Sequence, residues 1–421
     1  MESPKGGLRK LRLLPALVPA FAMAVLLLLA VSGCATGGPS GPSGREFPES
    51  RENPAAPDRL PPPEQGFSGI PPEITITRWS GGAGAACSLT FDDGTLDQYT
   101  AAFPLLESRG LKATFFLTTG YRDEGIWMDG TRARRLLTWD QAREIHRAGH
   151  ELGSHGLYHR DMGLPREEAV YPRLFEEEFG EAARRIREET GAPASFFAWP
   201  YFRSDSRARQ ASAGRYIAAR DGYASASRLM AFPDSWFISP PDPQAVVSYA
   251  LLPSQTAEEW MNLAGHIEEI GGWLVLCFHG VDSPGIPREN LGWAPLPEAR
   301  FTGILDFLKN PSVWTAPFGT VYRYIRQREA ARIELLEYTP ALLSFRVSLP
   351  DTEEFTGSAP VPLTIRIRKP PLWSDSEIEI PGGHRVLYED RQEILLETVP
   401  LWTPVQNPAI VAQSVTLRTR S

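Results

Sequence analysis

Short apolar runs and longer amphipathic stretches alternate along the middle of the chain. Runs such as residues 86–91 (ACSLTF), 112–118 (KATFFLT) and 273–278 (WLVLCF) predict strands. Residues 195–199 also predict a strand, and weaker strand patterns cover residues 223–227 and 245–251. Apolar residues at helical spacing predict helices at residues 97–108, 138–148, 166–190, 256–270, 298–308 and 319–328. This alternation indicates parallel strands with helices outside them, as a barrel or as an open sheet.

The pattern changes at about Ile333 and stays different as far as Ser421. Short segments with alternating apolar residues, broken by Pro or Gly-Gly, run from IELLEYT to SVTLRT. Such segments predict a small antiparallel β domain, sandwich-like, over residues 333–421.

The N-terminal part fits neither pattern. Four basic residues precede an uncharged stretch, Leu13 to Gly33, which ends in Val31-Ser32-Gly33-Cys34. A basic head, an apolar segment and small residues describe an export signal, and this ending resembles a bacterial lipobox. The resemblance implies that residues 1–33 are a lipoprotein signal peptide and that Cys34 is lipidated. The alternative is an uncleaved transmembrane anchor, because the apolar run is long enough to span a bilayer.

Residues 34–72 are rich in Gly, Pro and Ser and cannot bury a core, so we expect a semi-extended tether. Together with the patterns above, this predicts four parts: a signal peptide at 1–33, the tether, a catalytic domain at 73–332 and a β domain at 333–421. Both interpretations of the N-terminus place the body of the protein outside the cytoplasm, on a membrane.

Composition narrows the class of protein. The 421 residues are 42% hydrophobic and 22% charged, as in globular proteins. With 43 basic and 51 acidic residues the net charge is -8, and loss of the signal peptide, which carries a net +3, leaves -11. This acidic balance argues against a nucleic-acid binder. Three Cys are too few for a scaffold built on disulfides.

Polar residues follow several predicted strands, and the carboxyl ends of parallel strands are where such folds carry active sites. Asp92, Asp93 and Gly94 end the first strand. If one carboxylate binds a metal ion, the other stays free to accept a proton, and the Gly permits a tight turn. An ordinary loop would also explain an Asp-Asp-Gly turn.

His155 and His159 follow another short strand. Two His four residues apart fall on one side of a helical turn and can chelate one ion, although surface His pairs also occur. With Asp93 they form a candidate site of two His and one carboxylate, with positions open for water or substrate.

His279 ends the most apolar strand, where it could donate a proton to a leaving group. A structural His at a strand end is the alternative. Residues 197–201 (FAWPY) end a further strand, and a backbone N–H just after Pro200 could face a developing oxyanion. Core packing would also explain these aromatic residues.

The order TFDDG, SHGLYH, FAWPY and LCFHG, each at a strand end, resembles the polysaccharide deacetylases of the NodB-homology type, carbohydrate esterase family 4. The resemblance covers roughly residues 74–328. It implies a distorted (β/α) barrel and removal of N- or O-acetyl groups from polysaccharides with a divalent metal. We expect Zn²⁺ as this metal, with Co²⁺, Mn²⁺ or Ni²⁺ as alternatives.

The same resemblance implies a role for each matching residue. The implied metal ligands are Asp93, His155 and His159. Asp92 would be the general base and His279 the general acid of a single displacement. The backbone N–H of Tyr201 would help to hold the tetrahedral oxyanion.

Two features depart from the family pattern. Many relatives carry an Arg that braces the base in the third motif, and Ala198 stands there in this chain. Arg220 is our candidate for the missing guanidinium. The fourth motif, an Asp and a Trp that orient the acid His, has only a partial match at residues 233–236 (PDSW), and Asp242 is another candidate.

The remaining candidates have weaker support. Trp127, Trp199, Pro200 and Trp293 could contact sugar rings, although packing would explain each of them. The two strand cysteines, Cys87 and Cys277, could pair in an oxidising compartment or remain buried free thiols.

The sequence therefore predicts a monomeric, membrane-tethered, metal-dependent deacetylase whose partner is an acetylated polysaccharide or oligosaccharide and not a nucleic acid. An O-acetyl esterase of the xylan type and a non-catalytic glycan-binding envelope lipoprotein are the alternatives. A protein that only binds has no need of both Asp92 and His279. Ala35 after the lipidated Cys favours the outer membrane if the cell is Gram-negative.

Overall fold

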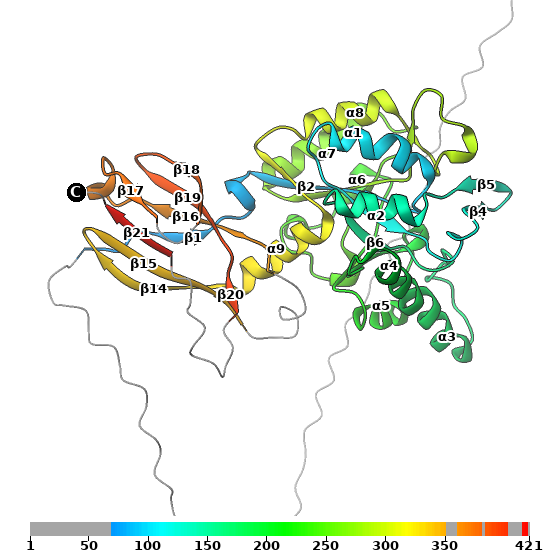
Figure 1. Ribbon diagram of the computed structural model, residues 1–421, viewed down its shortest axis with the longest axis horizontal. Helices are drawn as coiled ribbons and strands as arrows, with labels where there is room; N and C mark the ends of the chain where they lie inside the picture. The colour runs from blue at the N-terminus through cyan, green and yellow to red at the C-terminus, as the bar shows by residue number, and fades with distance from the viewer. Residues whose placement is uncertain (1–68, 351–359, 381–383, 403–414, 420–421) are drawn as a thin grey trace, which may run out of the picture. The chain divides into compact units, whose positions relative to one another are not determined.

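The structure is a computed structural model that describes residues 69–350, 360–380, 384–402 and 415–419 (Figure 1). The predicted signal peptide, the lipidation site Cys34 and nearly all of the tether lie outside the described residues. Among the residues described, no helix is both long and apolar enough to cross a membrane.

A parallel sheet forms the centre of the region predicted to be catalytic. Its strands run in the order β8-β7-β6-β3-β2-β10-β9, and β13 pairs in parallel with the start of β2. The strands are β2 (Ala85–Phe91), β3 (Thr114–Leu117), β6 (Glu151–Ser154), β7 (Phe196–Ala198), β8 (Ala218–Arg220), β9 (Tyr249–Ala250), β10 (Trp273–Phe278) and β13 (Val313–Thr315).

The two ends of this sheet approach each other. Single parallel bridges join Arg220 to Val246 and Tyr223 to Tyr249, and Tyr249 pairs in turn with β10. The ring of strands is thus closed by isolated bridges where a regular ladder is missing. This irregular closure confirms the predicted distorted (β/α) barrel.

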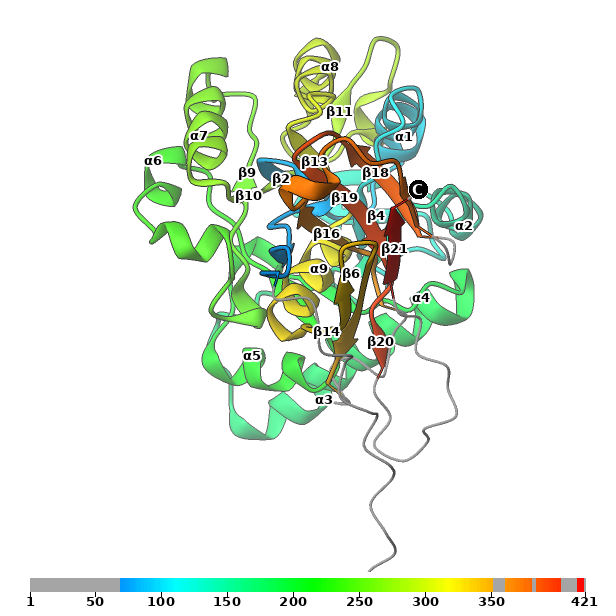
Figure 2. The same ribbon diagram turned by 90° about the vertical axis from the view of Figure 1, so that its left-hand side faces the viewer.

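Helices cover the outside of the barrel, as Figures 1 and 2 both show. They are α1 (Phe103–Glu107), α2 (Trp139–Arg147), α3 (Tyr171–Phe175), α4 (Ala182–Thr190), α5 (Ser206–Ala213), α6 (Ala226–Leu229), α7 (Ala257–Ile270) and α8 (Glu298–Phe307). Alternate strand residues such as Leu89, Phe91 and Leu276 pack with these helices in one apolar cluster. The alternation follows from the two-residue period of a strand.

The opposite strand faces fill the barrel interior together with α9 (Phe318–Ala330). Ala86, Phe116 and Val275 share this second cluster with Val321 and Ile325 of the helix. The backbone N–H of Phe318 donates to Thr114 Oγ1, at the first residue of β3. The helix therefore closes the amino end of the barrel and leaves the carboxyl end for a site.

The C-terminal region consists of two small sheets. One has the order β1-β16-β19-β18 and the other β14-β15-β21-β17, and all of these neighbours are antiparallel. The strands are β1 (Ile74–Ile76), β14 (Arg332–Thr339), β15 (Leu342–Leu349), β16 (Leu363–Arg368), β17 (Ile378–Glu379), β18 (Arg385–Glu389), β19 (Glu393–Thr398) and β21 (Val415–Thr419). Residues of both sheets share one apolar cluster, as expected for a sandwich.

Two details differ from a purely antiparallel sandwich that starts at residue 333. A short strand, β20 (Leu401–Trp402), pairs in parallel with β15. β1 lies at the start of the predicted catalytic domain but pairs with β16. The domain boundaries themselves stay predictions.

Two local predictions were wrong, and one strand was not predicted. The predicted strand at 223–227 is a bridge at Tyr223 followed by α6, which Ser225 caps. The strand that belongs there is β8, three residues long and rich in Ala. The predicted helix 166–190 begins with a 3₁₀ turn, η3 (Glu168–Val170), and contains a π-helical segment, η4 (Glu176–Glu181), between α3 and α4.

Candidate functional site

The turn after β2 carries Asp92 and Asp93 at the carboxyl end of the barrel. Asp93 and Gly94 both have positive φ, 75° and 74°. The buried guanidinium of Arg122 fixes this turn, because it donates to the carbonyl oxygens of Asp93 at 3.2 Å and of Gly94 at 3.3 Å. A Cβ on Gly94 would lie 2.5 Å from Arg122 Nη2. The turn therefore needs a Gly for two reasons, its backbone angle and the Arg beside it.

His155 and His159 lie on the loop after β6. The predicted helical turn is wrong, since Gly156 and His159 have φ of 83° and 55° and residues 155–159 form an irregular loop. The two rings still meet, with centroids 4.8 Å apart. Glu178, a fully buried residue of η4, holds the loop by accepting hydrogen bonds from the backbone N–H of Leu157 and Tyr158 at 3.0 and 3.1 Å.

Three ligand atoms converge at this loop. Asp93 Oδ1 lies 3.6 Å from His155 Nε2 and 3.5 Å from His159 Nε2. The same oxygen is buried and has no hydrogen-bond partner among the described residues. His155 Nδ1 is 2.8 Å from the carbonyl oxygen of Ala198, so this nitrogen carries the proton and Nε2 presents its lone pair.

These three residues fit a divalent metal ion. Burial lowers the pKa of His155 and lowers that of His159 further below its ordinary value, so both rings are neutral ligands near pH 7. Burial, and then the charge of Asp92, raise the pKa of Asp93 well above its ordinary value. A cation would compensate this buried, unpartnered carboxylate.

Asp92 sits beside this group and is paired with Arg220. Both residues are fully buried, and Arg220 Nη2 lies 2.6 Å from Asp92 Oδ1 and 2.5 Å from Oδ2. Burial raises the pKa of Asp92, but Arg220 together with His155 and His279 outweighs it, and the pKa falls to about 2. Asp92 is therefore an ionised carboxylate at neutral pH.

The position of Arg220 explains the departure at Ala198. The two residues are register partners on the neighbouring parallel strands β7 and β8. Side chains at paired positions of adjacent strands point to the same face of a sheet. The guanidinium of Arg220 thus reaches Asp92 from the strand next to the one that carries Ala198. The bracing role of Arg220 is a proposal that this geometry supports.

His279 follows β10 and faces the same carboxylate. Its Nε2 lies 3.8 Å from Asp92 Oδ2, and its ring is 4.9 Å from that of Trp293. Burial lowers the pKa of His279 to about 4, although the charge of Asp92 acts in the other direction. Its carbonyl oxygen accepts from Thr95 and Gln98, each at 3.3 Å.

Neither candidate for the fourth motif pairs with His279. Asp234 pairs with His266 at 3.4 Å and Asp242 with Arg209 at 3.0 Å. Within the described part of the chain, His279 Nδ1 is buried without a hydrogen-bond partner. The group that orients this ring was therefore not found at the positions that the sequence suggested.

A cavity of about 320 Å³ joins these side chains. It is lined by Asp92, Asp93, Trp127, Asp129, His155, His159, Tyr201, Phe202, His279 and Trp293. Tyr201 and Phe202 have positive φ, 58° and 53°, and Tyr201 is 55% exposed. Strained non-Gly residues of this kind cluster at functional sites.

The four candidates for sugar contact divide into two pairs. Trp127 and Trp293 line the cavity, next to His159 and His279 respectively. Trp199 does not, because it is fully buried and its Nε1–H donates to the carbonyl oxygen of Gln244 at 2.7 Å. Pro200 is also buried and does not line the cavity. Trp199 therefore packs in the core, which corrects the prediction of sugar contact.

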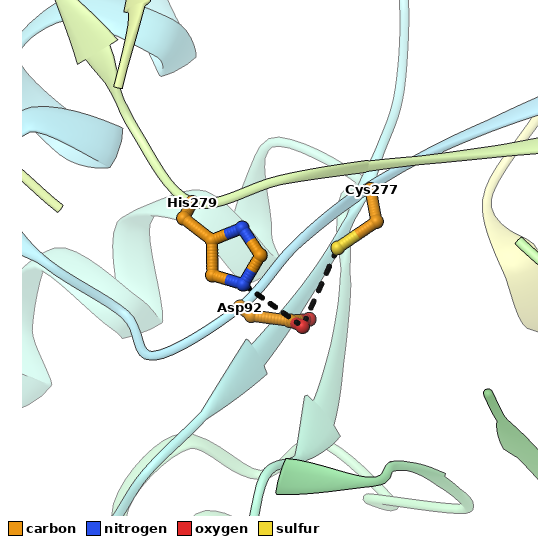
Figure 3. A group of neighbouring side chains, drawn as sticks. All are labelled: Asp92, Cys277 and His279. Atoms are coloured by element: carbon orange, nitrogen blue, oxygen red, sulfur yellow. Dashed lines mark hydrogen bonds and ion pairs between the residues drawn. The ribbon is translucent and has the colours of Figure 1, made fainter. Parts of the chain in front are cut away.

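A second group of possible metal ligands lies alongside, formed by Asp92, Cys277 and His279 (Figure 3). The guanidinium of Arg220, bonded to both oxygens of Asp92, opposes a cation there. Cys87 and Cys277 are both free and buried, so the pairing considered from the sequence does not occur.

The sequence did not point to several residues that shape the site. Arg122 and Glu178 act on backbone atoms, and Asp129 lines the cavity from the hairpin of β4 (Ile126–Asp129) and β5 (Arg132–Arg135). Asp97 Oδ2 accepts from the backbone N–H of Val281, just after His279. None of these residues belongs to a strand-end motif, and the sequence around each carries no pattern that sets it apart from other charged residues.

Comparison with known proteins bears on the same part of the chain. Residues 82–216 match the family model for polysaccharide deacetylase. A gellan lyase from a Bacillus species is 22% identical over 316 residues, which is 72% of this chain and 12% of that protein. The chain thus spans about an eighth of the length of that relative.

Solved structures show further likenesses. A deacetylase from Streptococcus pyogenes in complex with acetate is 22% identical, with a TM-score of 0.33 over 42% of this chain and 69% of the other. A family 4 acetyl xylan esterase from Clostridium thermocellum, in complex with a cobalt ion, is 19% identical. Its TM-score is 0.34, and the match covers 56% of this chain and 90% of the other.

The family match includes the turn of Asp92 and Asp93, the loop of His155 and His159, and Tyr201. Residues 82–216 therefore carry a polysaccharide deacetylase domain, the kind of domain that the strand-end motifs resemble.

Proposed function

We propose that this protein is a metal-dependent hydrolase that removes acetyl groups from a polysaccharide or oligosaccharide, with an N-acetyl group as the expected substrate and an O-acetyl group as the alternative. The observation that carries the proposal is the convergence on one cavity of a candidate metal-binding triad and two further groups, Asp92 and His279, suited to proton transfer.

Asp93, His155 and His159 would hold the metal. Bound there, a divalent ion would polarise the acetyl carbonyl and acidify a water molecule. Two imidazoles and one carboxylate are ligands that suit zinc, which is why we favour it. The hydrogen bond from His155 Nδ1 to the Ala198 carbonyl keeps the ring aimed at the ion.

Asp92 and His279 would move the proton. The carboxylate of Asp92 is ionised, fixed by Arg220 and free of the metal triad, so it can accept a proton from water at Oδ2. His279 Nε2 faces the same oxygen at 3.8 Å. A proton taken up there is within reach of His279, which would deliver it to the leaving nitrogen or oxygen.

The rest of the cavity would position the acetylated sugar. Tyr201, at its strained turn, would offer its backbone N–H to the oxyanion of the tetrahedral intermediate. Trp127 and the partly exposed Trp293 line the cavity beside His159 and His279, where an aromatic face can stack on a sugar ring.

The N-terminal sequence supports a site of action outside the cytoplasm. A lipid on Cys34 would tether the protein to a membrane outside the cytoplasm, and residues 34–72 would let the catalytic domain reach glycans of the cell envelope. In a Gram-negative cell we propose the outer membrane.

Acetate release tests this function. The purified protein, loaded with Zn²⁺, is incubated with chitooligosaccharides, peptidoglycan, poly-N-acetylglucosamine and acetylated xylan, and its bound metal is measured. We expect about one ion per chain and acetate from at least one glycan. Asp93→Ala should lose both, whereas the control His266→Ala, on α7 away from the cavity, should lose neither.

The pattern of substrates separates the alternatives. Acetate from the N-acetylated glycans alone supports an amidase, and acetate from xylan alone supports an esterase. A protein that binds metal and glycan but releases no acetate would be the non-catalytic binder and would overturn the proposal. Unchanged acetate release by Asp93→Ala would show that the metal site is wrongly assigned.

A further inference from the structure

Cys277 is the second-last residue of β10 and lies two residues before His279. Since strand residues alternate in direction, Cys277 points into the barrel on the same side as Val275 of the interior cluster. Its Sγ reaches Asp92 Oδ2 at 3.4 Å, and both residues are fully buried (Figure 3).

The thiol approaches the carboxylate from outside the cavity. Asp92 and His279 line the cavity, and Cys277 does not. Burial raises the pKa of Cys277 well above its ordinary value, so the sulfur keeps its proton and is the donor of this contact. Asp92 Oδ2 thus receives Arg220 Nη2 and the thiol from the protein side, while His279 Nε2 faces it at 3.8 Å.

A carboxylate oxygen offers a limited number of lone-pair directions. Two fixed donors on Oδ2 limit rotation of the carboxylate about its Cβ–Cγ bond and define the direction in which another proton can approach. Arg220 alone uses a single nitrogen for both oxygens and leaves more of that freedom. A sulfur donor bonds more weakly than an oxygen or nitrogen donor, so it orients the base without strongly opposing its protonation.

We propose that Cys277 is a positioning residue for the base, whose thiol donates a hydrogen bond to Asp92 Oδ2 and holds that oxygen toward the cavity. The kinetic part of this inference rests on the proposed function. The hydrogen bond itself does not, and it can be measured in protein that shows no turnover.

Cys87 is a matched control. It is a buried, free thiol on the adjacent strand β2, but it points to the outer apolar cluster, and its sulfur has no hydrogen-bond partner among the described residues. Substitution of either residue removes a buried sulfur and leaves a similar void. Only at Cys277 is a donor to the base lost.

The kinetic test compares Cys277→Ala and Cys277→Ser with Cys87→Ala in the full-length, zinc-loaded protein. We expect Cys277→Ala to lower kcat about tenfold, the effect of one hydrogen bond to a charged group, with KM and metal content unchanged. Cys277→Ser retains a donor and should recover most of kcat. Cys87→Ala should keep kcat even if it loses as much thermal stability. Equal kcat in Cys277→Ala and Cys87→Ala would overturn the proposal.

The second test measures the thiol directly by its infrared S–H stretch. A wild-type minus Cys277→Ser difference spectrum isolates the Cys277 band, and wild type minus Cys87→Ser isolates that of Cys87. We expect the Cys277 band at the lower frequency, because donation to a carboxylate weakens the S–H bond, and we expect Asp92→Asn to move it upward. Coincident bands would overturn the proposal. Wild-type protein without acetate release but with a lowered Cys277 band would refute only the proposed function.

Discussion

Asp92 and its main partner, Arg220, are 128 residues apart in the sequence. No local sequence pattern around Asp92 predicts this contact. The motif residues themselves were predictable, because four strand ends in the right order carry them. Arg220 could be proposed as a partner of Asp92 only because the family pattern lacks its guanidinium at Ala198. The contact with Cys277 could not be predicted, because it depends on which strands become neighbours in the closed sheet.

The Arg220 pairing predicts a defect in turnover without loss of metal. Arg220→Lys keeps a charge but cannot bond both oxygens of Asp92 and also Ser248, so we expect kcat to fall by about 10²-fold, the low end of a general-base contribution. Bound zinc should stay at the wild-type level. Arg209→Lys, on α5 and paired with Asp242, is the control. Normal turnover and metal content in Arg220→Ala would contradict the bracing role.

Gly94 and Gly110 make a second residue-scale comparison. Both have positive φ, 74° and 67°, but a Cβ on Gly94 would meet Arg122 and Leu117, whereas Gly110 has open space. We expect Gly110→Ala to lower the free energy of unfolding by about 1 kcal/mol, from the backbone angle alone. Gly94→Ala should lower it by about 2 kcal/mol more and reduce metal binding as well. Urea titration measures the free energy of unfolding of both variants. Equal losses would show that the side chain of Arg122 moves aside at little cost.

At the scale of elements, helix ends were predicted better than short strands. The predicted helices at 138–148 and 256–270 and the end of the one at 166–190 agree with the structure, where Thr138 and Thr256 cap α2 and α7 and Gly191 ends α4. Capping depends on neighbours in sequence. The three residues of β8 carry no pattern of their own and are strand only because β7 pairs with them. The loop of His155 and His159 was misjudged for the same reason, since Glu178 holds it from another element.

Glu178 links the π-helical segment η4 to the loop that carries the candidate metal ligands His155 and His159. Glu178→Gln replaces one acceptor oxygen by an NH₂ group that faces a backbone N–H, and the loop should become less fixed. We expect zinc affinity to fall about tenfold, as for other groups that orient metal ligands. Glu177→Gln is the control, because Glu177 pairs with Arg160 and Arg173 on the surface. Competition with a chromophoric chelator measures the affinity, and equal values for both variants would contradict this role.

The same residue makes stability depend on pH. Burial raises the pKa of Glu178 from 4.5 to about 7, so the folded state keeps a proton that the unfolded state loses above pH 4.5. Its contribution to the free energy of unfolding is therefore complete below pH 4.5 and falls by roughly 3 kcal/mol as the pH rises to 7. Glu178→Gln lacks this pH dependence. Urea titrations in the presence of a chelator should show a flatter pH profile for the variant, and parallel profiles would refute the assignment.

At the scale of the whole molecule, the two ends of the catalytic region are tied to the C-terminal sheets. β1 pairs with β16, and the buried hydroxyl of Tyr324 on α9 donates to the carbonyl oxygen of Thr77 and accepts from the backbone N–H of Thr364. No described residue beyond Ala330 lines the cavity. The described part of the C-terminal region thus contacts the barrel away from the cavity, and we expect it to have a supporting role.

Tyr324→Phe tests this support. The variant leaves a buried carbonyl oxygen and N–H without their partner, so we expect a loss of about 2 kcal/mol in the free energy of unfolding, with kcat and metal content unchanged. Tyr99→Phe, whose hydroxyl bonds Glu144 on the surface, should lose less than about 0.5 kcal/mol. Calorimetry distinguishes the two, and a fall in kcat of Tyr324→Phe would mean that the C-terminal region reaches the site.

The bracing role proposed for Arg220, the register partner of Ala198, has a consequence for how related genomes are interpreted. A survey that counts a chain as active only if it carries Arg in the third motif would record this one as a degenerate pseudoenzyme. The useful criterion is three-dimensional: any position whose side chain shares the face of β7 and reaches Asp92 can supply the charge. A chain with Ala at that motif should therefore be classified by the residue at the paired position of the next strand.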